Sequence, residues 1–362
     1  MPPQRRVSCS SLNKTNERGV EMAGMKKHIN IPIFIPHLGC PNDCVFCNQR
    51  SISGKMSFSP DSVIQEIEEA LSTVKEGQDV EIAFFGGSFT GIDRELMIYL
   101  LDIAQEYVDS GRVSGIRLST RPDYINEEIL HILKGYAVKT IELGIQSMDD
   151  DVLVACKRGH VSSQTEKACS LVKEFGFSLI GQMMVGLPLA SVDGEKITAQ
   201  KICEMGADGA RIYPTVVFYD TQLCKMSMRG EYEPLDLDEA VFRTKETLKV
   251  FEGNNVPCIR VGLCASENLS SEESVYGGAN HSAIGELAIG EIFFERLDSA
   301  LEAKKKSENF EKIPTVYVPQ GCVSKAIGQK RKNILRLCEK YSLANIKVLE
   351  NSSIIGYNIL LS

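Results

Sequence analysis

Residues 31–50 read IPIFIPHLGCPNDCVFCNQR, an apolar segment followed by a loop with three closely spaced cysteines. The segment Ile31–Ile35 has the length and composition of a buried strand. Cys40, Cys44 and Cys47 follow it with C-x3-C-x2-C spacing. Thiolates are soft ligands that suit iron–sulfur clusters and zinc, and a [4Fe–4S] cluster normally takes four cysteines. Three cysteines leave one iron open, so the spacing predicts a [4Fe–4S] cluster that can bind a further ligand.

The three cysteines are also compatible with a zinc site or with ordinary core packing. A zinc site of the Cys3His type would take His37 or His281 as its fourth ligand. The three cysteines could also be unrelated residues of the hydrophobic core, because free cysteine is often buried. The other nine of the twelve cysteines are scattered without close partners, and the chain is not short. A secreted disulfide scaffold is therefore not expected, and we expect a reducing compartment, the cytoplasm.

Outward from this loop, short apolar runs alternate with longer amphipathic stretches as far as about residue 261. The runs are Ile31–Ile35, Val80–Phe85, Gly115–Ser119, Thr140–Gly144, Ser178–Val185 and Gly209–Tyr213. Repeated strand-then-helix units predict a parallel sheet covered by helices, either a doubly wound sheet or a partial barrel. The distinctive residues, including the cysteines and Gly86–Thr90, come directly after strands, where a barrel gathers its reactive groups. We therefore predict a partial (β/α)6 TIM-like barrel with a small C-terminal α/β domain.

The charge of the chain is unevenly distributed. The net charge is −8, but Lys304–Glu350 holds eleven Lys or Arg and four Asp or Glu, a net charge of +7. An acidic body argues against non-specific nucleic-acid binding by the whole surface, whereas the basic segment suits an anionic partner. We expect a disordered extension over residues 1–24, a barrel with its C-terminal extension over 25–303 and a small basic domain over 314–362. No stretch approaches the ~20 apolar residues that a membrane span needs.

The cysteine loop resembles the signature of the radical S-adenosylmethionine (SAM) superfamily. Phe46 holds the position before the last cysteine, where that family places an apolar or aromatic residue against the adenine of SAM. Phe84–Ser88 resembles the family's motif for the SAM amino group, which implies roles for Gly86, Gly87 and Ser88, although Ser88 stands where glutamate is usual. The resemblance implies a [4Fe–4S] cluster and SAM as cofactors. It also implies reductive cleavage of SAM to a 5′-deoxyadenosyl radical.

A second and longer match lies at residues 142–160, ELGIQSMDDDVLVACKRGH. It resembles the same stretch in oxygen-independent coproporphyrinogen oxidases and in the catalytic subunit of Elongator. The resemblance implies that Gln146 lies near the SAM sugar or the substrate. It also implies that Arg158 pairs with the SAM carboxylate, which a planar guanidinium can grip through two hydrogen bonds. In the stretch GQMMVGLP, Gln182 holds a place for a ribose-binding residue, and Ser119 is a further ribose candidate.

The finer resemblance is to the Elongator branch, carried by GARIYPTVVFYDTQL at residues 209–223 and by Arg158–His160. It implies modification of an RNA base, most readily in tRNA, with electrons from a donor such as flavodoxin or ferredoxin. A small-molecule substrate such as a porphyrinogen remains open, as does a non-catalytic RNA-binding protein with a structural metal site. We find no counterpart of the acetyltransferase domain of Elongator-type enzymes, so acetyl transfer by this chain alone is not predicted. Candidates for the substrate side, chosen on position alone, are Tyr213, Thr215, His281 and Glu286.

The basic C-terminal segment contains a short loop between two predicted helices. This loop, Ile327–Arg331, resembles the GxxG loop of KH domains, which packs backbone amides and basic side chains against single-stranded nucleotides. The resemblance implies RNA contacts from Gly328, Lys330, Arg331 and Lys332, although Arg331 occupies the place of the second glycine. The other interpretation is a small α/β cap with a solvated basic helix face.

Overall fold

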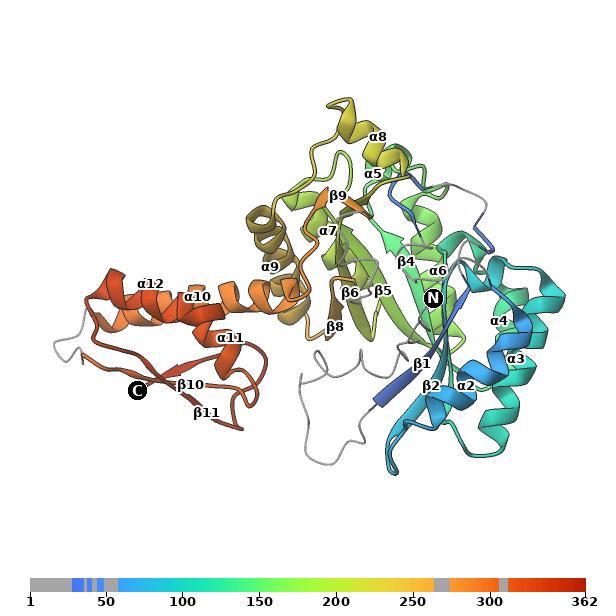
Figure 1. Cartoon of the computed structure of the whole chain (residues 1–362), viewed down its shortest axis with the longest axis horizontal. Coiled ribbons are helices and arrows are strands. Elements are labelled where there is room, and N and C mark those ends of the chain that lie inside the picture. The colour runs from blue at the N-terminus through green and yellow to red at the C-terminus, as the bar shows by residue number, and fades with distance from the viewer. Residues whose placement is uncertain (1–27, 36–37, 41–43, 49–57, 264–273, 306–311) are drawn as a thin grey trace, which may run out of the picture.

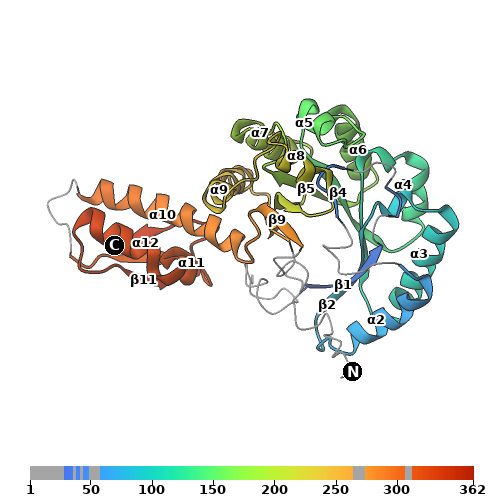
Figure 2. The ribbon, with the colours of Figure 1, turned by 45° about the horizontal axis from the view of Figure 1, so that its top comes forward.

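The computed structural model describes residues 28–35, 38–40, 44–48, 58–263, 274–305 and 312–362. Within them, seven parallel strands form one sheet that curls into a half-barrel (Figures 1 and 2). In sheet order they are β1 (His28–Ile35), β2 (Asp79–Gly86), β3 (Gly115–Thr120), β4 (Val138–Gln146), β5 (Ser178–Val185), β6 (Gly209–Pro214) and β8 (Cys258–Val261). The predicted partial barrel is confirmed, but six strands were expected. The strand β8 was not predicted, because its four residues, CIRV, do not form an apolar run.

Helices cover the convex side of the sheet (Figure 2). The larger ones are α2 (Val63–Leu71), α3 (Arg94–Asp109), α4 (Glu127–Lys134), α6 (Ser162–Glu174), α7 (Val192–Glu204) and α9 (Leu237–Gly253). Several begin at a side chain that accepts a hydrogen bond from the first turn, such as Asp93, Asn126, Ser191 and Asp236. The shorter helical segments are α5 (Asp150–Ala155), α8 (Gln222–Met228), and the 3-10 turns η2 (Pro60–Ser62), η3 (Phe89–Gly91) and η4 (Pro122–Tyr124).

Alternation along the strands separates an apolar face from a polar one. Ile31, Ile33 and Ile35 of β1 are buried in the main hydrophobic core together with Val63 and Ile67 of α2. The intervening positions point to the face of the sheet that the helices do not cover, because successive side chains of a strand alternate. This inner face therefore remains for polar residues and for a site.

The C-terminal segment folds into a small three-stranded sheet with two helices. Its elements are β10 (Thr315–Val318), α11 (Val323–Ile327), η5 (Gln329–Arg331), α12 (Lys332–Tyr341), β11 (Lys347–Glu350) and β12 (Leu360–Leu361). The central strand β10 pairs in parallel with β11 and antiparallel with β12. A separate two-stranded ribbon joins β7 (Val216–Phe218) to β9 (Val275–Gly278).

The long helix α10 (Ile284–Lys305) contributes to two cores. Its first half, including Ala288 and Ile292, packs in the core of the half-barrel. Its second half, including Phe293, Leu297 and Leu301, packs against β10 and α12. The small C-terminal unit therefore uses a helix that begins on the barrel. Figure 1 shows this helix extending away from the barrel.

Two further expectations concern the N-terminal residues and membrane spans. The extension predicted over residues 1–24 lies outside the described residues. Among the helices that the structure does describe, none is both long enough and apolar enough to cross a membrane.

Candidate functional site

The loop that carries Cys40 rests directly on the turn after β2. The amide of Ser88 donates to the carbonyl oxygen of Leu38 at 3.1 Å. A Cβ on Gly87 would lie 2.1 Å from that same oxygen, and a Cβ on Gly39 would lie 2.2 Å from the carbonyl oxygen of Ser88. Only glycine fits at either position without movement of the backbone. This turn therefore fixes where the first cysteine stands.

We expect Gly87→Ala to displace the cysteine loop, because the added methyl group has no room beside Leu38. The variant should fold but should lose most of its capacity to bind iron, measured per chain after anaerobic reconstitution. Gly253→Ala is the matched control, since a Cβ there meets no described atom within 4 Å, and its iron content should equal that of the parent. Equal iron in the two variants would contradict the packing argument.

The three predicted ligand thiols follow β1 at the carboxyl edge of the half-barrel. Cys44 is buried, Cys40 and Cys47 are half-buried, and none of the three forms a disulfide with another described cysteine. The amide of Val45 donates to the carbonyl oxygen at the end of α5 at 3.1 Å, which ties the loop to the barrel. Phe46, predicted to lie against adenine, packs on an apolar cluster that includes Val45.

Arg158 brings a buried guanidinium to the cysteine loop. Its Nη1 donates toward the sulfur of Cys44 at 3.4 Å, and its Nη2 donates to the carbonyl oxygen of Gly144 at 2.6 Å. A Cβ at position 144 would lie 2.8 Å from that Nη2, so a larger residue there would displace the guanidinium. The Nε of Arg158 is buried and has no hydrogen-bond partner within the described residues. An unpaired buried donor is costly, so it indicates an acceptor that the described residues do not provide.

A second guanidinium, that of Arg121, contacts the main chain of Arg158 and was not among the predicted site residues. Its Nη2 donates to the carbonyl oxygen of Arg158 at 2.5 Å, and its Nε and Nη2 donate to the carboxylate of Asp123 at 2.9 and 2.8 Å. Its Nη1 is buried without a partner in the described part of the chain. A signal was present in the sequence, because Arg121 comes two residues after the third predicted strand, at the edge where a barrel gathers its reactive groups.

The two arginines dominate the charge around the thiols. Burial raises the pKa of the Cys40 thiol, and the positive charges of Arg158 and Arg121 oppose that rise. The buried ring of His160 lies 3.8 Å from Asp123, measured from Nδ1 to Oδ1. Burial and the charge of Arg158 lower the pKa of His160 to about 4. The histidine is therefore neutral near pH 7, and the positive charge at this position comes from the arginines.

Two of the polar residues predicted to bind SAM have different surroundings. Gln146 ends β4 in the left-handed region with φ 68°, and its Oε1 is buried without a partner among the described residues. Strained backbone at a non-glycine residue is typical of functional sites. Ser88 is fully buried, and its hydroxyl hydrogen-bonds that of Thr120 at 2.7 Å. The Ser88 side chain thus stabilises the turn on which the cysteine loop rests.

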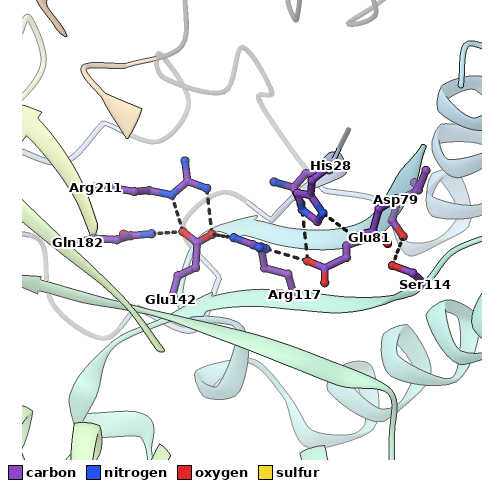
Figure 3. A network of polar contacts seen from close by, with 10 residues as sticks. His28, Asp79, Glu81, Ser114, Arg117, Glu142, Gln182 and Arg211 are labelled. Atoms are coloured by element: carbon purple, nitrogen blue, oxygen red, sulfur yellow. Dashed lines mark hydrogen bonds and ion pairs between the residues drawn. The ribbon is translucent and has the colours of Figure 1, made fainter. Parts of the chain in front are cut away.

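The inner face of the sheet carries a ladder of buried charges whose pairing was not predicted from the sequence (Figure 3). The carboxylate of Glu142 on β4 accepts from Arg117 of β3 at 3.0 Å and from Arg211 of β6 at 2.8 and 2.9 Å. Gln182 of β5 donates to the same carboxylate at 2.8 Å. Arg117 also donates to Glu81 of β2 at 3.0 Å, so the ladder links five strands.

The ladder balances its own charge. Burial alone would raise the pKa of Glu142, but the guanidinium groups of Arg211 and Arg117 outweigh burial and hold that pKa below the ordinary glutamate value. Gln182, which was predicted near a ribose, also donates to Ser119, the other ribose candidate, at 3.3 Å. The signal in the sequence was one charged residue inside each of four apolar strands. Charges buried in this way need partners.

The four substrate-side candidates are distributed over different places. Tyr213 is half-buried on the inner face of β6. Thr215 is buried and its hydroxyl donates to a carbonyl oxygen of β5 at 2.8 Å, so it links two strands. Glu286 is exposed in the first turn of α10, and His281 lies in the preceding loop, where its Nδ1 accepts from a backbone amide at 3.1 Å.

The predicted RNA-contacting residues lie on the C-terminal unit. Gly328 has φ 77°, and a Cβ there would lie 2.9 Å from the side chain of Asn333. The amide of buried Asn333 donates to a carbonyl oxygen of α10 at 2.8 Å and fixes the loop to that helix. Lys330 and Arg331 both adopt left-handed backbone, with φ 50° and 63°. Together with Lys332 they are exposed.

The donor set suits a cluster better than a single metal ion. Over the described ranges, no three His, Cys, Asp or Glu side chains are placed to hold one ion, and His37 lies outside those ranges. A [4Fe–4S] cubane makes a different demand, because each of its cysteines binds a different iron. The unpaired Nε of Arg158 and the unpaired amide oxygen of Gln146 supply polar atoms for a ligand beside the thiols. The residues present therefore fit a cluster whose open iron carries a polar ligand.

Most of the chain also matches known proteins that belong to one superfamily. Residues 34–195 match the model of the radical SAM superfamily, and residues 207–292 match that of the radical SAM C-terminal domain. An uncharacterised protein of Methanocaldococcus jannaschii is 30% identical over 228 residues, which cover 60% of this chain and 70% of that protein. A tRNA uridine(34) acetyltransferase of Methanocaldococcus infernus is 26% identical over 274 residues, which cover 66% of this chain and 51% of that protein. The chain spans about half the length of this acetyltransferase.

A solved structure of the archaeal Methanocaldococcus infernus Elp3, with an N-terminal deletion, has a similar fold. The TM-score is 0.58 at 20% sequence identity, and the match covers 78% of this chain and 64% of that one. At this level of identity the likeness concerns the fold, and it agrees with the half-barrel described above.

Proposed function

Because the chain belongs to the radical SAM superfamily, we propose that its radical chemistry modifies a base in tRNA. The protein is a radical SAM enzyme, and its cofactors are a [4Fe–4S] cluster and SAM. When bound, the cluster supplies the electron that splits SAM into methionine and a 5′-deoxyadenosyl radical. The protein supplies position, exclusion of water and control of the radical.

In this proposal Cys40, Cys44 and Cys47 bind three irons of the cluster. Arg158 receives the carboxylate of SAM, and the observation that carries this assignment is the buried, unpaired Nε of a guanidinium whose Nη1 contacts the Cys44 sulfur. A guanidinium–carboxylate contact is charge-assisted and directional, so it would orient SAM relative to the thiols. Gln146 offers its unpaired Oε1 to the sugar of SAM or to the substrate.

Two observations support tRNA as the substrate. The Methanocaldococcus infernus relative is named as acting on uridine 34 of tRNA, and the match with it covers 66% of this chain. The C-terminal unit presents Lys330, Arg331 and Lys332 on an exposed loop that Asn333 anchors to α10. Basic side chains on a fixed loop neutralise phosphates and position an RNA without reading its sequence. A flavodoxin or ferredoxin would deliver the electron.

Lys330→Glu combined with Arg331→Glu tests the RNA assignment. We expect weaker tRNA binding, because two phosphate contacts become repulsive. The slope of log K against log salt concentration is negative, and its magnitude should decrease by about two, one for each lost contact. Binding is measured by filter retention over a range of salt concentrations. Product formation is measured as a mass change in nucleosides of tRNA after incubation with SAM and dithionite.

The matched control reverses two exposed lysines, Lys75 and Lys139, at the opposite edge of the sheet from the cysteine loop. It makes the same change in net charge and should leave tRNA affinity close to that of the parent. Equal affinity in the two double variants would remove the loop from the RNA interface. If tRNA neither binds nor changes mass while SAM is still cleaved, the substrate is a small molecule.

A further inference from the structure

Arg121 is held from several sides at the back of the cysteine site. Its side chain is 3% exposed, in a position set by the carboxylate of Asp123 and the carbonyl oxygen of Arg158. Its backbone amide donates to the hydroxyl of Ser88 at 3.3 Å. The amide of Ser88 in turn contacts the carbonyl oxygen of Leu38, two residues before the first cysteine. Arg121 is thereby connected to the cysteine loop and to the arginine beside it.

The positive and negative charges around Arg121 do not cancel. Arg121 and Arg158 contribute two positive charges, Asp123 contributes one negative charge, and His160 is neutral near pH 7 because its pKa is about 4. The two guanidinium groups are almost fully buried. Charges act over longer distances in a buried site than in water, because the effective dielectric constant is lower. These four described groups therefore carry a net positive charge of one.

We propose that Arg121 is a positioning residue that also raises the reduction potential of the iron–sulfur cluster held by the three cysteines. Reduction adds one negative charge next to buried positive charge, and the positive charge stabilises the reduced form. Net charge and hydrogen bonding around the sulfurs are established influences on cluster potentials. This inference rests on the proposed binding of a cluster at Cys40, Cys44 and Cys47. It is independent of the identity of the substrate.

Asp123 provides a test of the sign, because its negative charge should lower the reduction potential that the positive charge of Arg121 raises. It pairs with Arg121 through two hydrogen bonds, and its carboxylate is also 3.8 Å from His160. Removing the negative charge of Asp123 should favour the reduced cluster, whereas removing the positive charge of Arg121 should disfavour it. A residue that only maintained packing would not produce shifts of opposite sign in these two variants.

The experiment is a redox titration of the reconstituted full chain without SAM, followed by the electron paramagnetic resonance signal of the reduced cluster. We expect Arg121→Gln to lower the one-electron equilibrium constant for reduction about tenfold, which corresponds to about 59 mV. Asp123→Asn should raise the potential, and Arg121→Lys should stay near the parent. Arg112→Gln, which removes an exposed charge paired with Glu68, should leave the potential unchanged.

Iron per chain is measured first in every variant. Unchanged potentials in Arg121→Gln and Asp123→Asn at full iron content would overturn the inference, as would shifts in the same direction. If Arg121→Gln fails to retain iron, the sign of the shift in Asp123→Asn decides. Failure of the parent to bind iron would instead refute the proposed function, so the two failures can be told apart.

Discussion

Replacing Glu142 with alanine should destabilise the folded barrel by about 3–5 kcal/mol, the range for breaking a buried ion pair from one side. The change leaves Arg117 and Arg211 buried without their shared acceptor, and it removes a partner of Gln182. The loss should appear as a lower denaturant midpoint in equilibrium unfolding at neutral pH. A loss below about 1 kcal/mol would show that the ladder contributes little to stability.

The same residue predicts the direction of acid sensitivity. The pKa of Glu142 is lowered in the folded state, so its stabilising contribution is present above the unfolded glutamate pKa of about 4.3 and is lost as the pH falls below it. The difference in stability between the parent and Glu142→Ala should therefore shrink in acid. Glu68→Ala is the control, because that carboxylate pairs with Arg112 on the surface and should matter much less.

Replacing Cys40, Cys44 and Cys47 together by alanine should abolish both cluster binding and SAM cleavage. Iron should fall from about four per chain to near zero after anaerobic reconstitution. No 5′-deoxyadenosine should form with SAM and dithionite, as measured by chromatography. The reason is that these thiols are the cluster ligands, and no other group of the described site replaces a thiolate.

Cys156→Ala is the matched control for this triple variant. Cys156 is buried close to the cysteine loop, and its carbonyl oxygen accepts from the amide of Val45, a contact that alanine preserves. Burial raises the pKa of the Cys156 thiol to about 12, so it is not a thiolate at neutral pH. The control should keep its iron and its activity. Zinc in place of iron in the parent would instead favour a binding protein with a structural metal.

The positions of the six long strands could be predicted because each is an apolar run of strand length. The prediction of Ser178–Val185 coincides with β5, and that of Gly115–Ser119 falls one residue short of β3. The placement of distinctive residues after these strands was enough to favour a barrel over a doubly wound sheet. The short strand β8 gave no such pattern, since only its pairing with β6 at the edge of the sheet makes it a strand.

The site was only partly predictable for a related reason. Cys40, Arg158 and their neighbours are marked by motif spacing, which is local in the sequence. Glu142 acquires its partners Arg117 and Arg211 from 25 and 69 positions away, and Arg121 contacts the carbonyl oxygen of Arg158, 37 positions away. One sequence does not specify which buried charges meet. The left-handed backbone of Gln146 is likewise imposed by a bulge between β4 and β5.

The sharing of α10 between two cores has a thermodynamic consequence. Unfolding of the C-terminal unit would expose Phe293, Leu297 and Leu301 on a helix that also packs against the barrel. The two parts cannot lose their packing independently, because the same helix would have to remain ordered with one side uncovered. Any ligand held by the basic loop therefore adds its binding free energy to the stability of the whole chain. An RNA that bound this loop would therefore also stabilise the folded barrel.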